Sequence, residues 1–405
     1  MTSPPRRILL ADADAFFVAV ARLVDPEGAG REPLLIVGGT RESRGVVCSA
    51  SYETRAYGVR SAMPIARALR LCPQAVCVPV PRKACQQKSG EIRQVLERFS
   101  PVVEGASIDE WYLDLAGTEA LYRHEPLAVT AARMREAILR DTGLRVSFGG
   151  GTSKLVAKLA VEHAKPRPGN DATGVHVVPA GGEAEFLRGV ALAEIPGVGP
   201  RFQERLAALG MRTVPDVLQY ERAELARWIG EREAAWLYVR VRGVDERAVA
   251  PRLEARSISR DETFPADLAD DASLARELLA LVTRAAADLR ADGLRARTIT
   301  VRVRDYDFRN RSASRTLAEG VMSDRVVLAV ARQLLSRLRA GRRVPARLLG
   351  VALSSLAEDE AADQLALFER EPDAAAETER DRAVARAVDL VRARFGPDGI
   401  GPGGL

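Results

Sequence analysis

Histidine and cysteine are scarce in this chain of 405 residues, which has three His and four Cys. No two of the cysteines form a CxxC pair, so the sequence argues against a zinc site and against a disulfide framework. We interpret Cys48, Cys72, Cys77 and Cys85 as small apolar side chains in the core. Chemistry in this protein must therefore depend on other residue types.

Long apolar runs are also lacking. No run reaches the roughly 18 residues that span a bilayer, and the N-terminus has neither the apolar stretch nor the cleavage site of a signal peptide. We therefore expect a cytoplasmic protein without a membrane partner. The chain is too long for one hydrophobic core, so two to four domains are predicted.

Charge is distributed unevenly. The chain has a formal net charge of +5, but residues 356–405 hold twelve Asp and Glu against six Arg. The preceding residues are therefore strongly basic, and residues 245–355 alone have 21 Arg against 15 Asp and Glu. A basic body with an acidic tail is compatible with a polyanionic partner, although ordinary solvated faces of an arginine-rich protein give the same composition.

Two acidic motifs lie in apolar strand patterns. Asp12 and Asp14 are two residues apart, so on a regular strand they point to the same face. Asp109 and Glu110 lie at the turn-side end of the predicted hairpin VVEGASIDEWYLDLAG. Acidic residues are costly to bury unless cations compensate them. A solvated strand end explains one such motif, but the pair of motifs favours a site for two Mg²⁺ ions acting on a phosphate substrate.

These residues carry a resemblance to a known family. ADADAFFVAV and ASIDEWYLDL resemble the two metal-binding motifs of the Y-family (translesion) DNA polymerases, of the bacterial DNA polymerase IV, or DinB, type. The resemblance implies that Asp12, Asp109 and Glu110 are catalytic metal ligands and that Ala13 adds its backbone carbonyl. It implies two Mg²⁺ ions, which Mn²⁺ can replace. Asp14 matches a position that is structural rather than catalytic.

The resemblance extends to the nucleotide pocket. Phe17 matches the steric gate that excludes a ribose 2′-hydroxyl; core packing is its alternative, and Phe16 is the competing candidate. The segment VVCSASYETRAYGVRSAMP resembles the fingers motif, which implies that Tyr52 and Arg55 bind the triphosphate, with Arg60 and Ser61 in the same motif. Lys158, which lies four residues after Lys154 on a predicted helix, is also expected to reach the triphosphate.

Other segments predict contacts with DNA. IPGVGPRFQERLAALG resembles a helix-hairpin-helix in which Gly197 and Gly199 let backbone N–H groups approach a phosphate. The segments ARSISRDETF and TITVRVRDYDFRNRSASRTL resemble the little-finger domain of the family. Its arginines are expected to line one strand face that holds the template backbone: Arg256, Arg260, Arg302, Arg304, Arg309 and Arg315.

The acidic tail contains a further motif. QLALF resembles the bacterial sliding-clamp-binding peptide, which would dock through Gln364, Leu365, Leu367 and Phe368; docking on its own protein is the alternative. Beyond it, an amphipathic helix is predicted from Val384, Val388, Val391 and Phe395, which lie at helical spacing, with an unknown partner.

The resulting prediction is an α+β multidomain protein with the fold of a right-hand polymerase. We expect an α/β palm (1–18 and 84–172), small fingers (19–83), a helical helix-hairpin-helix thumb (173–240), a linker (241–250), an α+β little finger (251–356) and an acidic tail (357–405). The expected activity is template-directed addition of dNTPs to a primer by a monomer, with low fidelity, translesion synthesis and no proofreading.

Two other functions are compatible with parts of the sequence. A catalytically inactive, DNA- and clamp-binding adaptor would lose the acids, and a nucleotidyl cyclase would not need the hairpin, the basic domain or QLALF. Two positions depart from the family pattern: Ala21 replaces a Glu after the first motif, and Trp111 follows the acidic pair where a small residue is common. Neither change removes a metal ligand.

Overall fold

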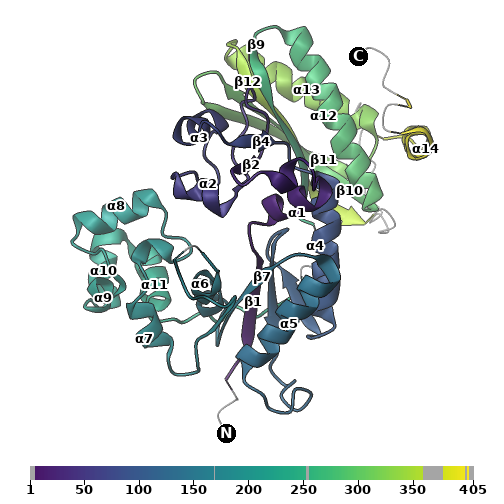
Figure 1. Ribbon diagram of the computed structural model, residues 1–405. Coiled ribbons are helices and arrows are strands. Elements are labelled where there is room, and N and C mark those ends of the chain that lie inside the picture. The colour runs from purple at the N-terminus through teal and green to yellow at the C-terminus, as the bar shows by residue number, and fades with distance from the viewer. Residues whose placement is uncertain (1–4, 168, 252–254, 359–376, 397–398, 401–405) are drawn as a thin grey trace, which may run out of the picture. The chain divides into compact units, whose positions relative to one another are not determined.

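A computed structural model describes residues 5–167, 169–251, 255–358, 377–396 and 399–400 (Figure 1). The chain divides into two compact units, residues 1–252 and 253–405, which are treated separately below. Within the described residues, no helix is long and apolar enough to cross a membrane.

The first unit is built on a five-stranded sheet with the order β5-β6-β1-β7-β8. All six residues of the central strand β1 are buried, as its apolar pattern predicts. The predicted hairpin is also confirmed, because β5 and β6 pair antiparallel. The strands are β1 (Ile8–Ala13), β5 (Val102–Gly105), β6 (Glu110–Asp114), β7 (Val146–Gly151) and β8 (Val175–Val177).

Helices cover both faces of this sheet. Leu9 and Ala11 pack in one cluster with residues of α4 (Arg82–Glu97) and α5 (Leu127–Thr142), whereas Ile8 and Leu10 pack against α6 (Lys154–Ala164). Helix α6 approaches β7 very closely. A Cβ on Gly149 would lie 2.2 Å from the carbonyl oxygen of Ala157, so only glycine permits this contact. The close approach brings the side chains of α6 to the ends of β1 and β6.

A smaller three-stranded sheet, with the order β3-β2-β4, follows β1 in the chain. Its strands are short, and its core contains Ile36, Val47 and Ile65. The elements of this part are α1 (Phe16–Val24), η1 (Ala29–Arg31), β2 (Leu35–Val37), β3 (Ser49–Ala50), α2 (Tyr52–Ala56), α3 (Ile65–Leu71) and β4 (Val76–Val78).

The rest of the first unit is helical, as predicted for residues 183–240, and has a core of its own around Leu206, Val217 and Leu237. Its elements are α7 (Glu183–Arg188), η2 (Leu192–Glu194), α8 (Pro200–Ala208), α9 (Val214–Leu218), α10 (Arg222–Ile229) and α11 (Glu231–Arg240).

The second unit is a four-stranded antiparallel sheet, β11-β10-β12-β9, packed on two helices. The sequence pattern of residues 253–355 indicates strand, helix, strand, helix, strand, and the observed sheet has one strand more. The missing strand, β11, lies at the sheet edge and alternates between exposed and half-buried residues, so it lacks an apolar run. The elements are β9 (Ser257–Leu268), α12 (Asp271–Ala291), β10 (Leu294–Asp305), β11 (Asn310–Val321), α13 (Asp324–Gly341), β12 (Ala346–Glu358) and α14 (Glu379–Phe395).

Candidate active site

The acidic motifs meet at the ends of two paired strands. Asp12 of β1 lies directly opposite Glu110 of β6 in the antiparallel register, so the two side chains emerge on the same face of the sheet. That face is the one covered by α6. Asp109 precedes β6, and its carbonyl oxygen accepts a hydrogen bond from the backbone N–H of Ala13 at 2.9 Å. Asp14 is turned away, because its carboxylate accepts a hydrogen bond from Ser147 at 2.8 Å.

Two lysines of the α6 region neutralise these carboxylates. The ammonium group of Lys165 lies 2.9 Å from Oδ2 of Asp12, and that of Lys158 lies 2.6 Å from Oε1 of Glu110 and 3.8 Å from Asp12. Burial raises the pKa of Asp12 to about 6, and the nearby ammonium groups offset only part of this effect. A cation next to Asp12 therefore favours its ionised form.

Four of the five predicted nucleotide-binding residues share one cavity of about 450 Å³ with the three acids, and the fifth, Lys158, does not line it. Tyr52 and Arg55 come from the short helix α2. The Arg55 guanidinium lies 4.8 Å from the centre of the Tyr52 ring, and its Nε donates to the carbonyl of Ala50 at 2.9 Å. The cavity is lined by Asp12, Ala15, Phe16, Phe17, Cys48, Ser49, Tyr52, Arg55, Arg60, Ser61, Asp109, Glu110, Glu162 and Lys165.

The two phenylalanines differ in burial. Phe16 is 2% exposed and belongs to the palm core, whereas Phe17 is half-buried. Their rings make an edge-on contact with centroids 5.5 Å apart. Phe17 is thus the ring with more freedom to face a sugar, and its role as the gate stays a prediction.

The donor atoms suit a divalent cation. Carboxylate and carbonyl oxygens are the ligands that Mg²⁺ and Mn²⁺ prefer, and here the oxygens of Asp12 and Glu110 already pair with ammonium groups. In the described part of the chain, no three His, Cys, Asp or Glu side chains are gathered around a single point. In this structure the Asp109 carboxylate accepts a hydrogen bond from Ser107.

Sequence reasoning missed Lys165 and Glu162, both of which line the cavity. Lys158, Glu162 and Lys165 lie at i, i+4 and i+7, which is the spacing of one helix face, and this signal would have found them. Lys154 is expected beside Lys158, but its ammonium group contacts Glu104 at 2.7 Å and its side chain is 7% exposed. It does not line the cavity of the acids.

The two departures from the family pattern have structural explanations. Trp111 points to the face opposite Glu110 and is 2% exposed in the core under α4 and α5. Its direct neighbours across the sheet are Ala11 and Gly105, whose small size leaves room for the indole. Ala21 is buried with Leu35 and Val37 beneath the small sheet. Neither residue lines the cavity of the acids.

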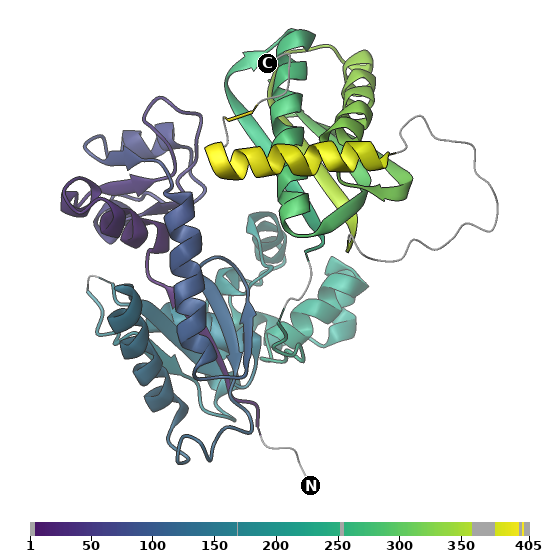
Figure 2. The same cartoon turned by 90° about the vertical axis from the view of Figure 1, so that its right-hand side faces the viewer.

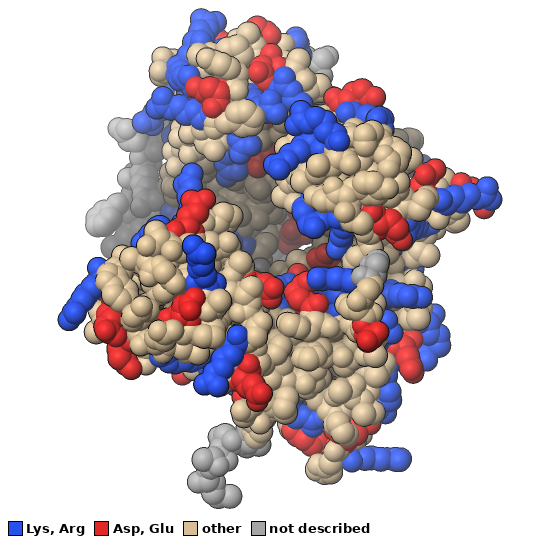
Figure 3. Space-filling view, turned by 60° about the vertical axis from the view of Figure 1, so that its left-hand side comes forward, with Lys and Arg blue, Asp and Glu red and all other residues tan. Residues whose placement is uncertain are grey.

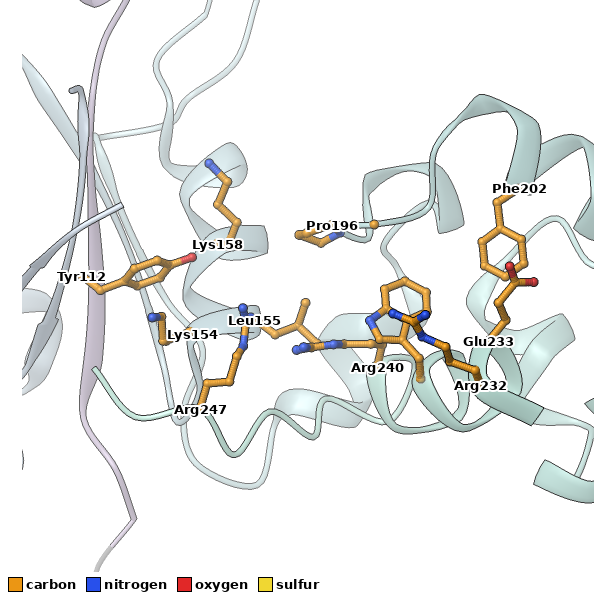
Figure 4. A pocket seen from close by; sticks show the side chains of 12 residues that line it. Tyr112, Lys154, Leu155, Lys158, Pro196, Phe202, Arg232, Glu233, Arg240 and Arg247 are labelled. Atoms are coloured by element: carbon orange, nitrogen blue, oxygen red, sulfur yellow. The ribbon is translucent and has the colours of Figure 1, made fainter. Parts of the chain in front are cut away.

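A second cavity in the first unit, of about 660 Å³, lies between α6 and the helical part (Figure 4). Its walls combine basic and aromatic side chains, a mixture that suits a nucleic-acid backbone. Gly197 also lines it and has a φ of +104°, whereas Gly199 has an ordinary φ of −78°. The labelled walls include Tyr112, Lys154, Lys158, Phe202, Arg232, Arg240 and Arg247.

The six arginines of the second unit do not share one strand face, so that expectation was wrong. Arg302 and Arg304 lie opposite Ser312 and Asn310, on the face without helices. Arg260 lies opposite Val351 and pairs with Asp288 of α12.

Arg315 lies opposite Ile299 and hydrogen-bonds to Gln333 of α13, so it too is on the helical side. The cause is strand register, which decides for each strand which of its residues lie on the helical face. In Figure 3, basic side chains are interspersed with acidic ones over the visible surface. The roles of Arg256, Arg309 and the other four in DNA binding stay predictions.

The predicted C-terminal helix exists as α14, but its partner is its own chain (Figure 2). Asp389 pairs with Arg290 of α12 at 2.6 Å, and Asp381 pairs with Arg325 of α13 at 2.5 Å. Only part of the expected apolar stripe is covered, because Val384 and Phe395 are 55% and 67% exposed whereas Val388 and Val391 are half-buried. Gln364, Leu365, Leu367 and Phe368 lie outside the described residues.

Fold and site together define a right-hand nucleic-acid polymerase, and comparisons agree. The impB/mucB/samB family model matches residues 11–162, its C-terminal domain matches residues 255–367, and a "DNA polymerase-iota, thumb domain" matches residues 193–245. The chain is similar to DNA polymerase IV of Desulfatibacillum aliphaticivorans (36% identity; 98% of this chain and 96% of that one) and of Methanoculleus marisnigri (38%; 88% and 96%).

Solved structures are similar as well. A "Y-family DNA polymerase chimera Dbh-Dpo4(243-245)-Dbh" matches with a TM-score of 0.73 and 25% identity, over 86% of this chain and 98% of that one. DinB from Sulfolobus solfataricus matches with a TM-score of 0.58 and 26% identity, over the same shares. The chain belongs to the Y-family of DNA polymerases and is a translesion DNA polymerase, a class that depends on divalent metal ions. These findings give no support to the inactive adaptor or the cyclase.

Proposed function

We propose that the chain extends a primer on a DNA template by two-metal transfer of dNMP units, with Mg²⁺ as the ordinary ion and Mn²⁺ as a substitute. One observation carries the proposal: Asp12 and Glu110 face each other across paired strands and share a cavity with Asp109, Tyr52 and Arg55. Acidic side chains that can bind metal ions and hydrogen-bond donors that can bind phosphates thus line the same cavity.

Each residue has a distinct role in this scheme. Asp12, Asp109, Glu110 and the carbonyl of Ala13 would hold the metal ions. When bound, the ions neutralise the phosphates and lower the pKa of the attacking 3′-hydroxyl. Tyr52 and Arg55 donate hydrogen bonds to triphosphate oxygens, and the stacked Arg55–Tyr52 pair presents both donors together.

The lysines complete the triphosphate site. Lys165 lines the cavity of the acids, and we assign it the phosphate contact that the sequence pattern gave to Lys158. Lys158 lines the neighbouring basic cavity instead and lies against Glu110, which suits a residue that balances charge at the boundary between nucleotide and DNA. Phe17 excludes the ribose 2′-hydroxyl.

Primer extension tests the proposal directly. A labelled primer-template with four dNTPs and Mg²⁺ is extended by the wild-type chain, and the rate falls by about 10³-fold or more in Asp109→Ala and Glu110→Ala, because transition-state charge loses its counter-ions. Asp141→Asn is the matched control, because this carboxylate of α5 pairs with Arg98 and does not line the cavity. Extension retained in both site variants would refute the assignment.

We further propose that the chain acts as a monomer that is recruited to the bacterial sliding clamp through residues 364–368. The motif has two Leu and one Phe in an acidic stretch with little else to form a core. Replacing Leu367 and Phe368 by Ala should leave extension without the clamp unchanged and abolish stimulation by the clamp. Stimulation that survives the double substitution would contradict this proposal, and sedimentation tests the monomer.

A further inference from the structure

Glu162 of α6 lines the cavity of the acids but has no part in the chemistry proposed above. Its carboxylate binds two cations, one with each oxygen. Oε1 accepts a hydrogen bond from Nζ of Lys165 at 2.6 Å, and Oε2 accepts one from Nη2 of Arg167 at 2.5 Å. A single acid thus holds together two cations that would otherwise repel each other.

Hydrogen bonds in the segment after α6 restrain the backbone of Lys165 and Arg167. The side-chain amide of Asn170 donates to the carbonyl of Lys165 at 3.0 Å and accepts from the backbone N–H of Arg167 at 2.9 Å. One amide therefore fixes the backbone of both cationic residues, while Glu162 fixes their side chains. This segment follows the helix at Pro166 and otherwise has no assigned role.

Lys165 has two acidic partners, and they are not equivalent. Its contact with Asp12, at 2.9 Å, uses an oxygen that a divalent cation would also use, so the two cations compete there. Glu162 is not among the proposed metal ligands. Burial opposes ionisation of Glu162, but Lys165 and Arg167 hold its pKa below the ordinary value. Glu162 is thus an ionised partner of Lys165 that the proposed metal site does not use.

We propose that Glu162 is a positioning residue for nucleotide binding, and that it keeps Lys165 and Arg167 at the wall of the cavity as a pair of triphosphate-binding cations. The inference rests on the proposed function and adds Arg167 as a specific phosphate contact. Arg167 suits this role because its side chain is 48% exposed and retains donors that Glu162 does not use. Without Glu162, both long side chains gain rotamer freedom, and binding must restrain them again.

Single-turnover extension at varied dNTP concentration tests the inference, because it separates the nucleotide Kd from the rate of incorporation. We expect Glu162→Gln to raise the Kd by roughly tenfold, as for a lost charge-assisted contact, and to change the maximal rate less than about twofold. Arg167→Gln should raise the Kd by a smaller factor, and Glu162→Asp should restore much of the affinity. In Arg167→Gln, which removes a positive charge, the dependence of Kd on salt should weaken.

Glu97→Gln is the matched control, since this carboxylate pairs with Arg93 on α4 and lies outside the cavity. A thermal midpoint equal to that of the wild type excludes a folding defect. An unchanged Kd in both Glu162→Gln and Arg167→Gln would overturn the inference while leaving the polymerase intact, and so would a fall in rate with no change in Kd. A wild-type chain that fails to extend primers would instead contradict the proposed function.

Discussion

Gly197 lies directly against the indole ring of Trp236: a Cβ at this position would come within 2.5 Å of the ring. Its φ of +104° is also unfavourable for any residue with a side chain. Gly199, two residues later, has a φ of −78° and no atom within 4 Å of such a Cβ. The hairpin therefore needs glycine at one of its two glycine positions only.

We accordingly expect Gly197→Ala to lower the free energy of unfolding by about 1–2 kcal/mol and to weaken binding of primer-template DNA, because the strained hairpin shifts its N–H groups. Gly199→Ala is the control and should behave as the wild type in both respects. Urea unfolding and fluorescence anisotropy with labelled DNA measure the two effects. Equal losses in both variants would show that the hairpin needs flexibility rather than one special conformation.

The steric gate gives a second prediction. Phe17→Ala should raise incorporation of ribonucleotides relative to deoxyribonucleotides on the order of 10–100-fold, because removing the ring leaves space for the 2′-hydroxyl. Phe16→Ala should instead destabilise the palm by about 3–5 kcal/mol, since its ring is 2% exposed in the core. Competing rNTP and dNTP insertion measures the first effect. If Phe17→Ala does not change the selectivity for deoxyribonucleotides, Phe17 is not the steric gate.

The split among the arginines gives a third prediction. Arg302→Ala and Arg304→Ala, on the open face of the second sheet, should each reduce the slope of log K against log salt by about 1 if each side chain contacts one phosphate. Arg260→Ala is the control on the helical side, where it pairs with Asp288. DNA binding measured at several salt concentrations separates the faces. If only Arg260→Ala lowers the slope, the helical face rather than the open face contacts the DNA phosphates.

The sequence predicted those features that depend on local pattern. The strand of Asp12 and the acidic hairpin follow from apolar patterns and a turn, and the structure has them as expected. The missing strand β11 and the split of Arg260 and Arg315 from Arg302 could not be found in this way. Both depend on strand register, which pairing between distant segments decides.

The positions of the two lysines could not be predicted for a related reason. Which of Lys158 and Lys165 faces the cavity depends on how α6 lies on the sheet, and that in turn depends on the close contact of Gly149 with Ala157. A family motif does not show how α6 lies on the sheet or which lysine faces the cavity. Trp111 shows the same limit, because its small neighbours Ala11 and Gly105 become neighbours only through sheet pairing.

The last prediction concerns pH and the segment after α11. Asp245 has a side chain that is 1% exposed and pairs with Arg240 at 2.9 Å and Arg247 at 2.8 Å. Burial alone would raise the pKa of Asp245, but hydrogen bonds from these two arginines lower it from 3.8 to about 2. The segment predicted as a linker is thus fixed to the first unit at this point, as it is at Ala250, whose N–H donates to Glu104 at 3.0 Å.

Because the folded-state pKa lies below the unfolded value, the ionised Asp245 stabilises the fold above about pH 4, and this contribution disappears as the pH falls toward 2. We expect about 1–2 kcal/mol, since Arg247 is 60% exposed and solvent screens its charge. Asp245→Asn should therefore be less stable than the wild type at pH 6, and the difference should shrink at pH 3.

Tryptophan fluorescence during urea unfolding is the appropriate measurement, because Trp111, Trp228 and Trp236 all lie in the first unit. Asp171→Asn, an exposed carboxylate for which the structure shows no ion pair with any described residue, should follow the wild type at both pH values. A difference between Asp245→Asn and the wild type that stays constant from pH 6 to pH 3 would mean that shape, rather than charge, makes Asp245 stabilising. The ion pairs with Arg240 and Arg247 would then not be what fixes this segment to the first unit.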